Sequence, residues 1–339
     1  MPKKQSVSVH DVARVAGVSA TTVSNALNGR GSMSEATRRR VLAIAREMGY
    51  VPNLAAQSLR GAKSATVGIV VSDIGDQLMA EVVTGIETAL WDAGYTCYIC
   101  VTHNDASREG ACLKRLCQRQ VEGLVLVNGH GHPELGMLSE GLPVVFVDPT
   151  QRLGHVNTVY VASDWHAMIV DGVRALAAHG CERIALVNAF ASMHAEDDVS
   201  VGALHDALDG LGLRLDRNLL LLGNSGGPRE EGRRLVGRCF DEGNRPDGIA
   251  CLGYPVALGA YDAMRERGLV PGRDALVINV GGTPDADMIS PSLSSLERHA
   301  CQMADRAAEA LLAMMAGKEP PSREVLVSHE VVERESTLG

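Results

Sequence analysis

Two short helices joined by a tight turn are predicted within residues 9–28, and this pair constrains the chain more than any other stretch. Val12, Ala13 and Ala16 recur at helical spacing and form the inward stripe of a first helix. Gly17 follows at the position where a left-handed backbone without a Cβ atom ends a helix. The chain therefore begins with a helical hairpin.

The second helix of the pair has a polar outer face. Ser19 is a favourable N-cap residue, and Val23, Ala26 and Leu27 form the inward stripe. The outward positions hold only small residues: Ala20, Thr21, Thr22, Ser24 and Asn25. Such residues let a helix lie deep in a DNA major groove, whereas an ordinary hairpin in a protein core would not need a polar outer face.

The charge of the chain is divided unevenly. Residues 1–63 contain ten basic and three acidic residues, a net charge of +7. The whole chain carries −9, which leaves −16 for the remaining residues. A basic head on an acidic body indicates that the head alone contacts a polyanion.

A third helix and a short connector complete the head. Ser34 caps a helix from about Glu35 to Met48, which Gly49 ends. Its apolar face consists of Val41, Leu42, Ala45 and Met48. The connector, residues 52–63, predicts a single helix too short to be stable alone, so it folds only when DNA or a second copy of the chain holds it.

The body alternates buried strands with amphipathic helices, a pattern typical of an α/β fold with parallel sheets. A strand is predicted at 66–71, and others at 95–101, 123–127, 143–147, 157–161, 183–187, 218–222, 248–252 and 275–280. About 275 residues exceed one comfortable core, so we expect two similar subdomains.

The sequence contains no motif that is typical of a catalytic site or a metal site. Cys97 and Cys100 form a CxxC, but on a strand their side chains point to opposite faces. The histidines lack metal-ligand spacing, and neither a P-loop nor a nucleophile elbow is present. The sequence predicts no cofactor, no metal and no catalytic site. Eight cysteines without a disulfide framework, and no readable signal peptide or membrane span, favour the cytoplasm.

The residues from Val7 to Lys63 resemble the DNA-binding head of the LacI/GalR family of bacterial transcriptional regulators. The matching pieces are Asp11-Val12-Ala13, Ala16-Gly17-Val18-Ser19, Thr22-Val23-Ser24, Asn28, Ser34-Glu35-Ala36-Thr37-Arg38, Met48-Gly49-Tyr50-Val51-Pro52-Asn53 and Ser58-Leu59. The resemblance implies that Ala20, Thr21 and Asn25 read bases, with Ser19, Thr22, Ser24 and Asn28 nearer phosphates.

The resemblance also implies that the connector is a hinge helix at the centre of a palindromic site. Leu59 stands where the family has a leucine that wedges into the minor groove. Asn53, Gln57 and Ser58 are further DNA-contact candidates, and Gln57 departs from the Arg or Lys of many members.

The body resembles the family's periplasmic-binding-protein-like core, which implies a head at 1–51, a hinge at 52–63 and a core at 64–339. Subdomain one is expected at 64–161 plus 292–320, and subdomain two at 162–291 plus 321–339. Three strands would cross between them near residues 162, 291 and 321. The helix at 76–93 and the segment at 104–119 lie where the family dimerises.

A small-molecule effector is expected in the cleft between the subdomains, whose opening or closure would change DNA affinity. Much of the family's polar set is replaced here, by Val199, Ser163-Asp164, Gly253-Tyr254 and Asn279-Val280-Gly281-Gly282. An ordinary sugar is therefore less expected, because an unpaired buried polar group costs about 1–3 kcal/mol. The candidate lining residues are Asp73, Asp148, Asp164, Trp165, His194, Tyr254 and Asn279, each with an alternative reading as a loop or rim residue.

Together these features predict a sequence-specific DNA-binding regulator, a repressor acting as a homodimer or tetramer on a palindromic operator. Two alternatives remain open at this point. One is a DNA-binding regulator with no small-molecule effector, and the other is a small-molecule binding protein of the periplasmic type. The second would need a signal peptide and would lack the basic head.

Overall fold

The protein is represented by a computed structural model that describes residues 7–27, 31–50, 64–129, 139, 141–149, 157–189, 199–223 and 227–339. Its contacts divide the chain into two compact units at Ser64 and Ala65. Of the predicted site residues, six lie outside the described parts: Asn28, Asn53, Gln57, Ser58, Leu59 and His194. The predicted hinge helix lies there too.

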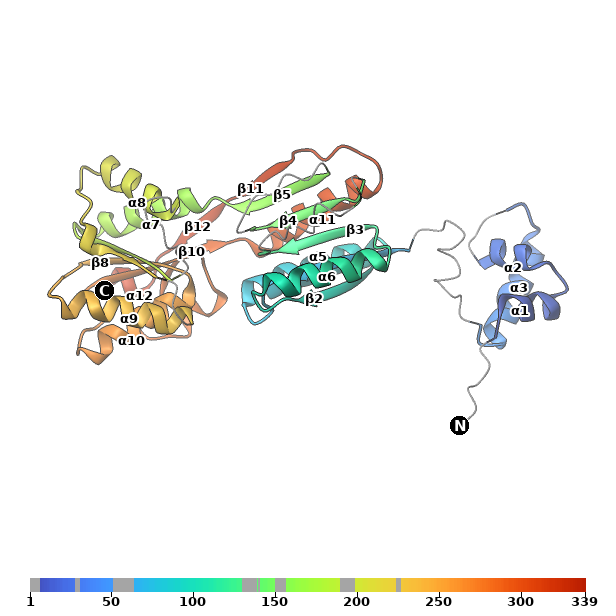
Figure 1. Ribbon diagram of the computed structural model, residues 1–339, viewed down its shortest axis with the longest axis horizontal. Coiled ribbons are helices and arrows are strands. Elements are labelled where there is room, and N and C mark those ends of the chain that lie inside the picture. Colours follow the sequence, from blue (N-terminus) through green and yellow to red (C-terminus); the bar gives the residue numbers. More distant parts are fainter. Residues whose placement is uncertain are drawn as a thin grey trace. The chain divides into compact units, whose positions relative to one another are not determined.

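The first unit is a bundle of three helices: α1 (Val9–Ala16), α2 (Ala20–Leu27) and α3 (Glu35–Glu47) (Figure 1). Each helix contacts the other two, which gives the unit a single small core. The buried residues are Val12, Ala13, Ala16, Val23, Ala26, Val41 and Ala45, and Leu27 and Met48 pack against them. Leu42 is the exception to the predicted apolar face, since it is exposed.

The second unit, the core, contains two six-stranded sheets. The first sheet consists of β1 (Thr66–Val71), β2 (Thr96–Val101), β3 (Gly123–Val127), β4 (Val144–Val147), β5 (Thr158–Ser163) and β11 (Glu324–Val327). The strand order is β11-β5-β4-β3-β1-β2, and all five pairings are parallel. We call this sheet and its helices the first subdomain.

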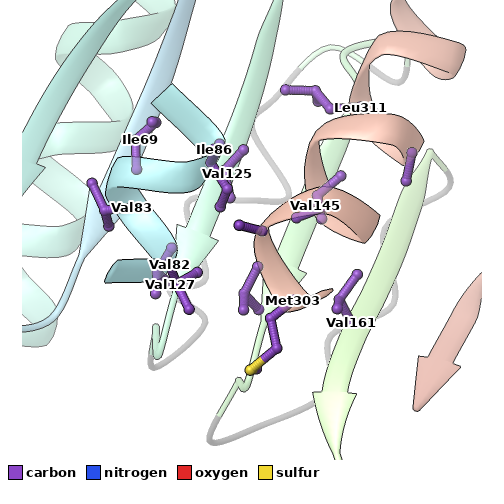
Figure 2. Packing of buried hydrophobic residues seen from close by; sticks show 14 of the residues in the cluster. Ile69, Val82, Val83, Ile86, Val125, Val127, Val145, Val161, Met303 and Leu311 are labelled. Carbon is purple, nitrogen blue, oxygen red and sulfur yellow. The ribbon is translucent and has the colours of Figure 1, made fainter. Parts of the chain in front are cut away.

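The first sheet is covered on both faces. One face packs against α5 (Gln77–Asp92) and α11 (Ala300–Met315), and the other against α6 (Ala106–Gln118). Figure 2 shows strand residues such as Ile69, Val125 and Val161 meeting Ile86 of α5 and Met303 of α11. Burial on both faces explains why β1, β3 and β4 are nearly uninterrupted apolar runs.

The second subdomain has the same layered plan. Its sheet consists of β6 (Ile184–Asn188), β7 (Leu220–Leu222), β8 (Gly248–Leu252), β9 (Leu276–Val280), β10 (Ser294–Arg298) and β12 (His329–Val332), in the order β12-β10-β9-β8-β6-β7. Only β12 runs antiparallel to its neighbour, β10.

Helices cover both faces of this second sheet (Figure 1). On one face lie α7 (Trp165–Ala178) and α8 (Val199–Gly210), and on the other α9 (Pro228–Asp241) and α10 (Tyr254–Glu266). Two 3₁₀ helices, η3 (Arg217–Leu219) and η4 (Pro284–Asp287), and the short C-terminal α12 (Glu335–Leu338) complete the subdomain.

The chain passes between the subdomains after β5, after β10 and between β11 and β12. The first crossover agrees with the expected position near residue 162. The second and third come later than expected, because β10 pairs with β9 and β11 pairs with β5. Residues 292–298 therefore belong to the second subdomain, and residues 324–327 to the first.

Candidate nucleic-acid interface and cleft

Local hydrogen bonds fix the start of α1, and a glycine ends the helix. The Ser8 amide donates to the Asp11 carboxylate over 3.1 Å, and the Asp11 amide donates to the Ser8 hydroxyl over 3.3 Å. These contacts form a capping box at the start of α1, and the Ser8 hydrogen bonds lower the pKa of Asp11. Gly17 ends α1 with φ 64°, as its position predicted.

Ser19 caps α2. The Thr22 amide donates to the Ser19 hydroxyl over 3.1 Å, and the two hydroxyl oxygens lie 2.9 Å apart. Arg40 of α3 fixes the same corner, since its Nη2 donates to the Ala16 carbonyl over 3.1 Å. The start of α2 is thus held by a residue of the turn, and the end of α1 is held by the third helix.

The predicted outer face of α2 is polar and accessible. Thr21 is exposed, and Ala20, Thr22, Ser24 and Asn25 are half-buried. The Asn25 amide lies against the turn before α3, because a Cβ atom at Gly31 would stand 3.0 Å from Asn25 Nδ2. Exposed arginines of the unit include Arg14, Arg39, Arg40 and Arg46.

At the junction of the subdomains, Asp148 is buried and fully engaged. Its Oδ1 accepts from the Ser163 amide over 2.6 Å, and its Oδ2 accepts from the Ser163 hydroxyl over 3.0 Å. Arg298 Nη1 donates to the same Oδ2 over 2.7 Å. Asp148 therefore binds the first crossover and the end of β10.

Arg298 was missed by the sequence reading, although it is the centre of this junction. Its Nε donates to the Gly281 carbonyl over 2.8 Å, and its guanidinium carbon lies 5.0 Å from the centroid of the Trp165 ring. We call Asp148, Ser163, Trp165, Gly281 and Arg298 the crossover cluster. Only contacts between distant segments reveal it, so no local sequence signal marked Arg298.

Other cleft candidates have local roles. Asp164 caps α7, with its Oδ1 accepting from the Ala167 amide over 2.9 Å. Asp73 is exposed, and its Oδ1 accepts from the Gly75 amide over 2.8 Å. Both carboxylates thus shape the turns that follow their strands.

Tyr254 and Asn279 differ sharply in environment. Tyr254 is half-buried at the start of α10, where burial and the nearby Asp285 carboxylate raise its pKa. Asn279 is fully buried within β9, and neither amide atom has a hydrogen-bond partner among the described residues. The structure therefore links Asp148 and Trp165 through Arg298, and it places Asn279 in the interior of the second sheet.

A groove of about 590 Å³ lies between α9 and α10, away from this cluster. Arg229 Nε lies 2.8 Å from Asp262 Oδ2, and Arg233 Nη1 lies 3.0 Å from Glu266 Oε1. Hydrogen bonds to carboxylates raise the pKa of both arginines. Since these charges are neutralised by neighbours, we assign no ligand site to the groove.

Further findings concern metal ions, membrane spans and cysteines. Among the described residues, no group of three or more potential metal ligands lies together. Within the same ranges, no helix is both long and apolar enough to cross a membrane. All eight cysteines are free thiols. Cys97 packs against the α5 side of the first sheet and Cys100 against the α6 side, as the strand reading predicted.

Comparison with solved structures identifies the fold. The lac repressor dimer bound to operator and the anti-inducer ONPF matches with a TM-score of 0.82 at 23% identity, covering 99% of this chain and 100% of that one. The transcription regulator GntR from Chromobacterium violaceum matches with a TM-score of 0.71 at 25% identity, covering 81% of this chain and 100% of that one.

Comparison of sequences gives full-length relatives. The HTH-type transcriptional regulator RegA of Clostridium saccharobutylicum is 28% identical, covering 98% of this chain and 99% of the relative. The HTH-type transcriptional repressor PurR of Yersinia enterocolitica is 27% identical, covering 97% and 96%. Catabolite control protein A of Staphylococcus epidermidis is 26% identical, covering 98% and 99%.

Family models match both units. Residues 8–53 match the bacterial regulatory proteins of the lacI family, and residues 173–337 match the periplasmic binding protein-like domain. The relatives are regulators rather than enzymes, and the fold agrees from the first helix to the last strand. The head therefore belongs to the lacI family of bacterial regulatory proteins, and the chain resembles transcriptional regulators over nearly its whole length.

Proposed function

We propose that the chain represses transcription by binding a palindromic operator as a homodimer, with α2 of each copy in a major groove. The observation that carries this proposal is the outer face of α2, whose small and mostly polar residues are exposed at Thr21 and half-buried at the other four positions. The net charge of +7 over residues 1–63 supports contact with phosphates.

Individual roles follow from position on α2. We propose that Ala20, Thr21 and Asn25 face base edges, and that Ser19, Thr22 and Ser24 lie nearer phosphates. Asn25 offers an amide with both a donor and an acceptor, which suits adenine. For Asn28, Asn53, Gln57, Ser58 and Leu59 the proposal rests on the sequence alone.

Exposed apolar side chains support dimerisation through the first subdomain. Ile74 lies just before α5, and Trp91 lies in the last turn of this helix. The edge strand β2 contributes Tyr98 and Ile99. Each of these four side chains is more than a third exposed. Large exposed apolar groups on neighbouring elements are typical of an interface. A Trp91→Glu variant is expected to shift the full chain toward monomer in analytical ultracentrifugation.

Selection from a random double-stranded DNA pool tests the operator proposal with the full chain. The expected result is a motif of two inverted half-sites. Enrichment of no motif, or of a single asymmetric site, would contradict it. Leu59→Ala tests the hinge, since it should weaken binding to the selected site more than binding to random DNA.

We also propose that a small molecule in the interdomain cleft modulates this binding. The residues proposed to line the cleft are Asp73, Asp148, Asp164, Trp165, His194 and Tyr254, and the seventh candidate, Asn279, is set apart because it is fully buried in β9. A thermal-shift screen of metabolites tests this, because a ligand that binds only the folded core raises its melting temperature.

A second candidate is a regulator that needs no effector. The crossover cluster favours it, because Asp148 already pairs with Arg298 and Ser163 rather than facing an open cleft. A screen without hits, together with strong operator binding by ligand-free protein, is the outcome expected for this second candidate. In either case we propose that the protein acts in the cytoplasm, where its DNA target lies.

A further inference from the structure

The ion pair between Arg298 and Asp148 joins the two subdomains. Asp148 follows β4 of the first sheet, and Arg298 ends β10 of the second, 150 residues later in the chain. Their side chains are only 5% and 10% exposed. The pair therefore lies inside the junction, where solvent and salt screen it weakly.

Each partner of the pair is held by its own subdomain or crossover. Ser163 donates two hydrogen bonds to Asp148, and Gly281 at the end of β9 accepts one from Arg298. The Trp165 ring at the start of α7 lies beside the guanidinium. Both side chains are already fixed, so little conformational entropy is lost when they meet.

A glycine makes room for Arg298 in the second subdomain. At Gly282, with φ 66°, an added Cβ atom would stand 3.0 Å from Glu297 Cα and 3.0 Å from the Leu296 carbonyl oxygen. The turn after β9 can therefore pass close to the end of β10 only without a side chain here. This close passage places the Gly281 carbonyl on Arg298.

A second contact crosses between the subdomains at another point. With the Gln77 amide oriented so that its nitrogen meets acceptors, it donates to the Asp285 carboxylate over 3.2 and 3.3 Å. Gln77 is the first residue of α5, and Asp285 lies in η4. The subdomains are thus tied at two places by side chains of the protein itself.

We propose that Arg298 is a built-in latch: by pairing with Asp148 it holds the two subdomains together without a bound ligand. This inference rests on the proposed function only for its effect on DNA binding. When the junction opens, water rehydrates both charges, so the pair alone resists opening modestly. The charge-assisted hydrogen bonds to prepositioned partners add to that resistance. An effector would therefore have to act against this latch or replace it.

Hydrogen exchange of the full chain, followed by mass spectrometry of its peptides, tests the latch. Arg298→Gln should raise amide exchange about tenfold at the ends of β4 and β5 and at the start of α7, that is, in both subdomains. Asp148→Asn should give the same pattern, and the double variant should add little to either single change.

Arg334→Gln is the matched control. This substitution removes the ion pair between Arg334 and Glu297, in which Nη2 lies 2.6 Å from Oε1. The pair lies wholly within the second subdomain. Exchange should then rise only there. If Arg298→Gln behaves like this control, or leaves the first subdomain unchanged, the latch is overturned.

One further variant completes the test. Should Arg298→Gln not fold, Arg298→Lys keeps the charge but loses the geometry of the guanidinium, and it should still raise exchange in both subdomains. No DNA is present in these measurements. A protein that opens as expected but binds no selected DNA would contradict the proposed function and leave the latch supported.

Discussion

The hydroxyl oxygens of Ser19 and Thr22 lie 2.9 Å apart at the start of α2, and those of Ser34 and Thr37 lie 2.8 Å apart at the start of α3. In both helices the threonine amide donates to the serine hydroxyl, over 3.1 and 3.2 Å. The two helix starts are therefore near-copies, although only α2 is proposed to enter DNA.

This similarity supplies an internal control for the DNA interface. Thr22→Val and Thr37→Val remove the same hydroxyl from equivalent positions, so each should lower stability by a similar amount, about 0.5–1.5 kcal/mol. Only Thr22→Val should also weaken operator binding, by about three- to tenfold, as measured by fluorescence anisotropy. Equal losses of affinity in the two variants would argue against a groove position for α2.

Asn25 substitutions should change which base is preferred at one position of each half-site. The Asn25 side chain lies beside Gly31, which restricts its orientation and so favours a defined contact. Replacing it with serine should relax discrimination at that position by about 1–3 kcal/mol and leave other positions unchanged. Selection from a random DNA pool measures this, and an unchanged motif would remove Asn25 from the base-reading set.

Much of the fold could be predicted because its signals are local. Gly17 and Ser19 mark the turn between α1 and α2, and the buried run of β1 contains no polar side chain except Thr66. The residue pattern did not indicate β10, β11 or β12, although the family resemblance placed crossing strands near residues 291 and 321, close to β10 and β11. Ser294, Glu297 and Arg298 interrupt the apolar pattern of β10, so only its pairing with β9 reveals it as a strand.

The cleft could be predicted only in part, for a related reason. Asp148 and Asp164 are both cleft candidates on the sequence alone, yet Asp164 serves as a helix cap and Asp148 as one half of an ion pair. What separates them is Arg298, which is 150 residues from Asp148 in the chain. A contact at that separation leaves no periodicity or spacing for a single sequence to show.

The C-terminal α12 should make the stability of the core sensitive to acid. The Ser292 amide donates to the Glu335 carboxylate over 2.7 Å and its hydroxyl over 3.0 Å, and these bonds lower the pKa of Glu335 below its usual 4.5. The contribution of the Glu335 carboxylate to stability is therefore present above about pH 4.5, and it is lost as the pH falls through the lowered pKa. In melting curves followed by tryptophan fluorescence, Glu335→Gln should lower the melting temperature at neutral pH and have progressively less effect in acid. A difference that stays constant with pH would contradict the assignment.

Asn279 should be a site where a less polar residue stabilises the protein. It is fully buried in β9, on the face that Val277 and Cys251 share, and neither of its amide atoms has a partner among the described residues. A buried polar group without a hydrogen bond costs about 1–3 kcal/mol, and leucine has the same branched shape without the polar atoms. Asn279→Leu should therefore raise the melting temperature of ligand-free protein by a few degrees.

Ser336→Ala is the appropriate comparison for Asn279→Leu. Ser336 is equally buried, but its hydroxyl donates to the Val277 carbonyl over 2.6 Å and accepts from the Ser294 amide over 2.8 Å. Removing it leaves both backbone groups unpaired, so the melting temperature should fall. If Asn279→Leu also lowers the melting temperature, the Asn279 amide has a polar partner in solution, such as a bound water. That result would return Asn279 to the set of ligand-contact candidates, because the same amide could then meet a polar group of an effector.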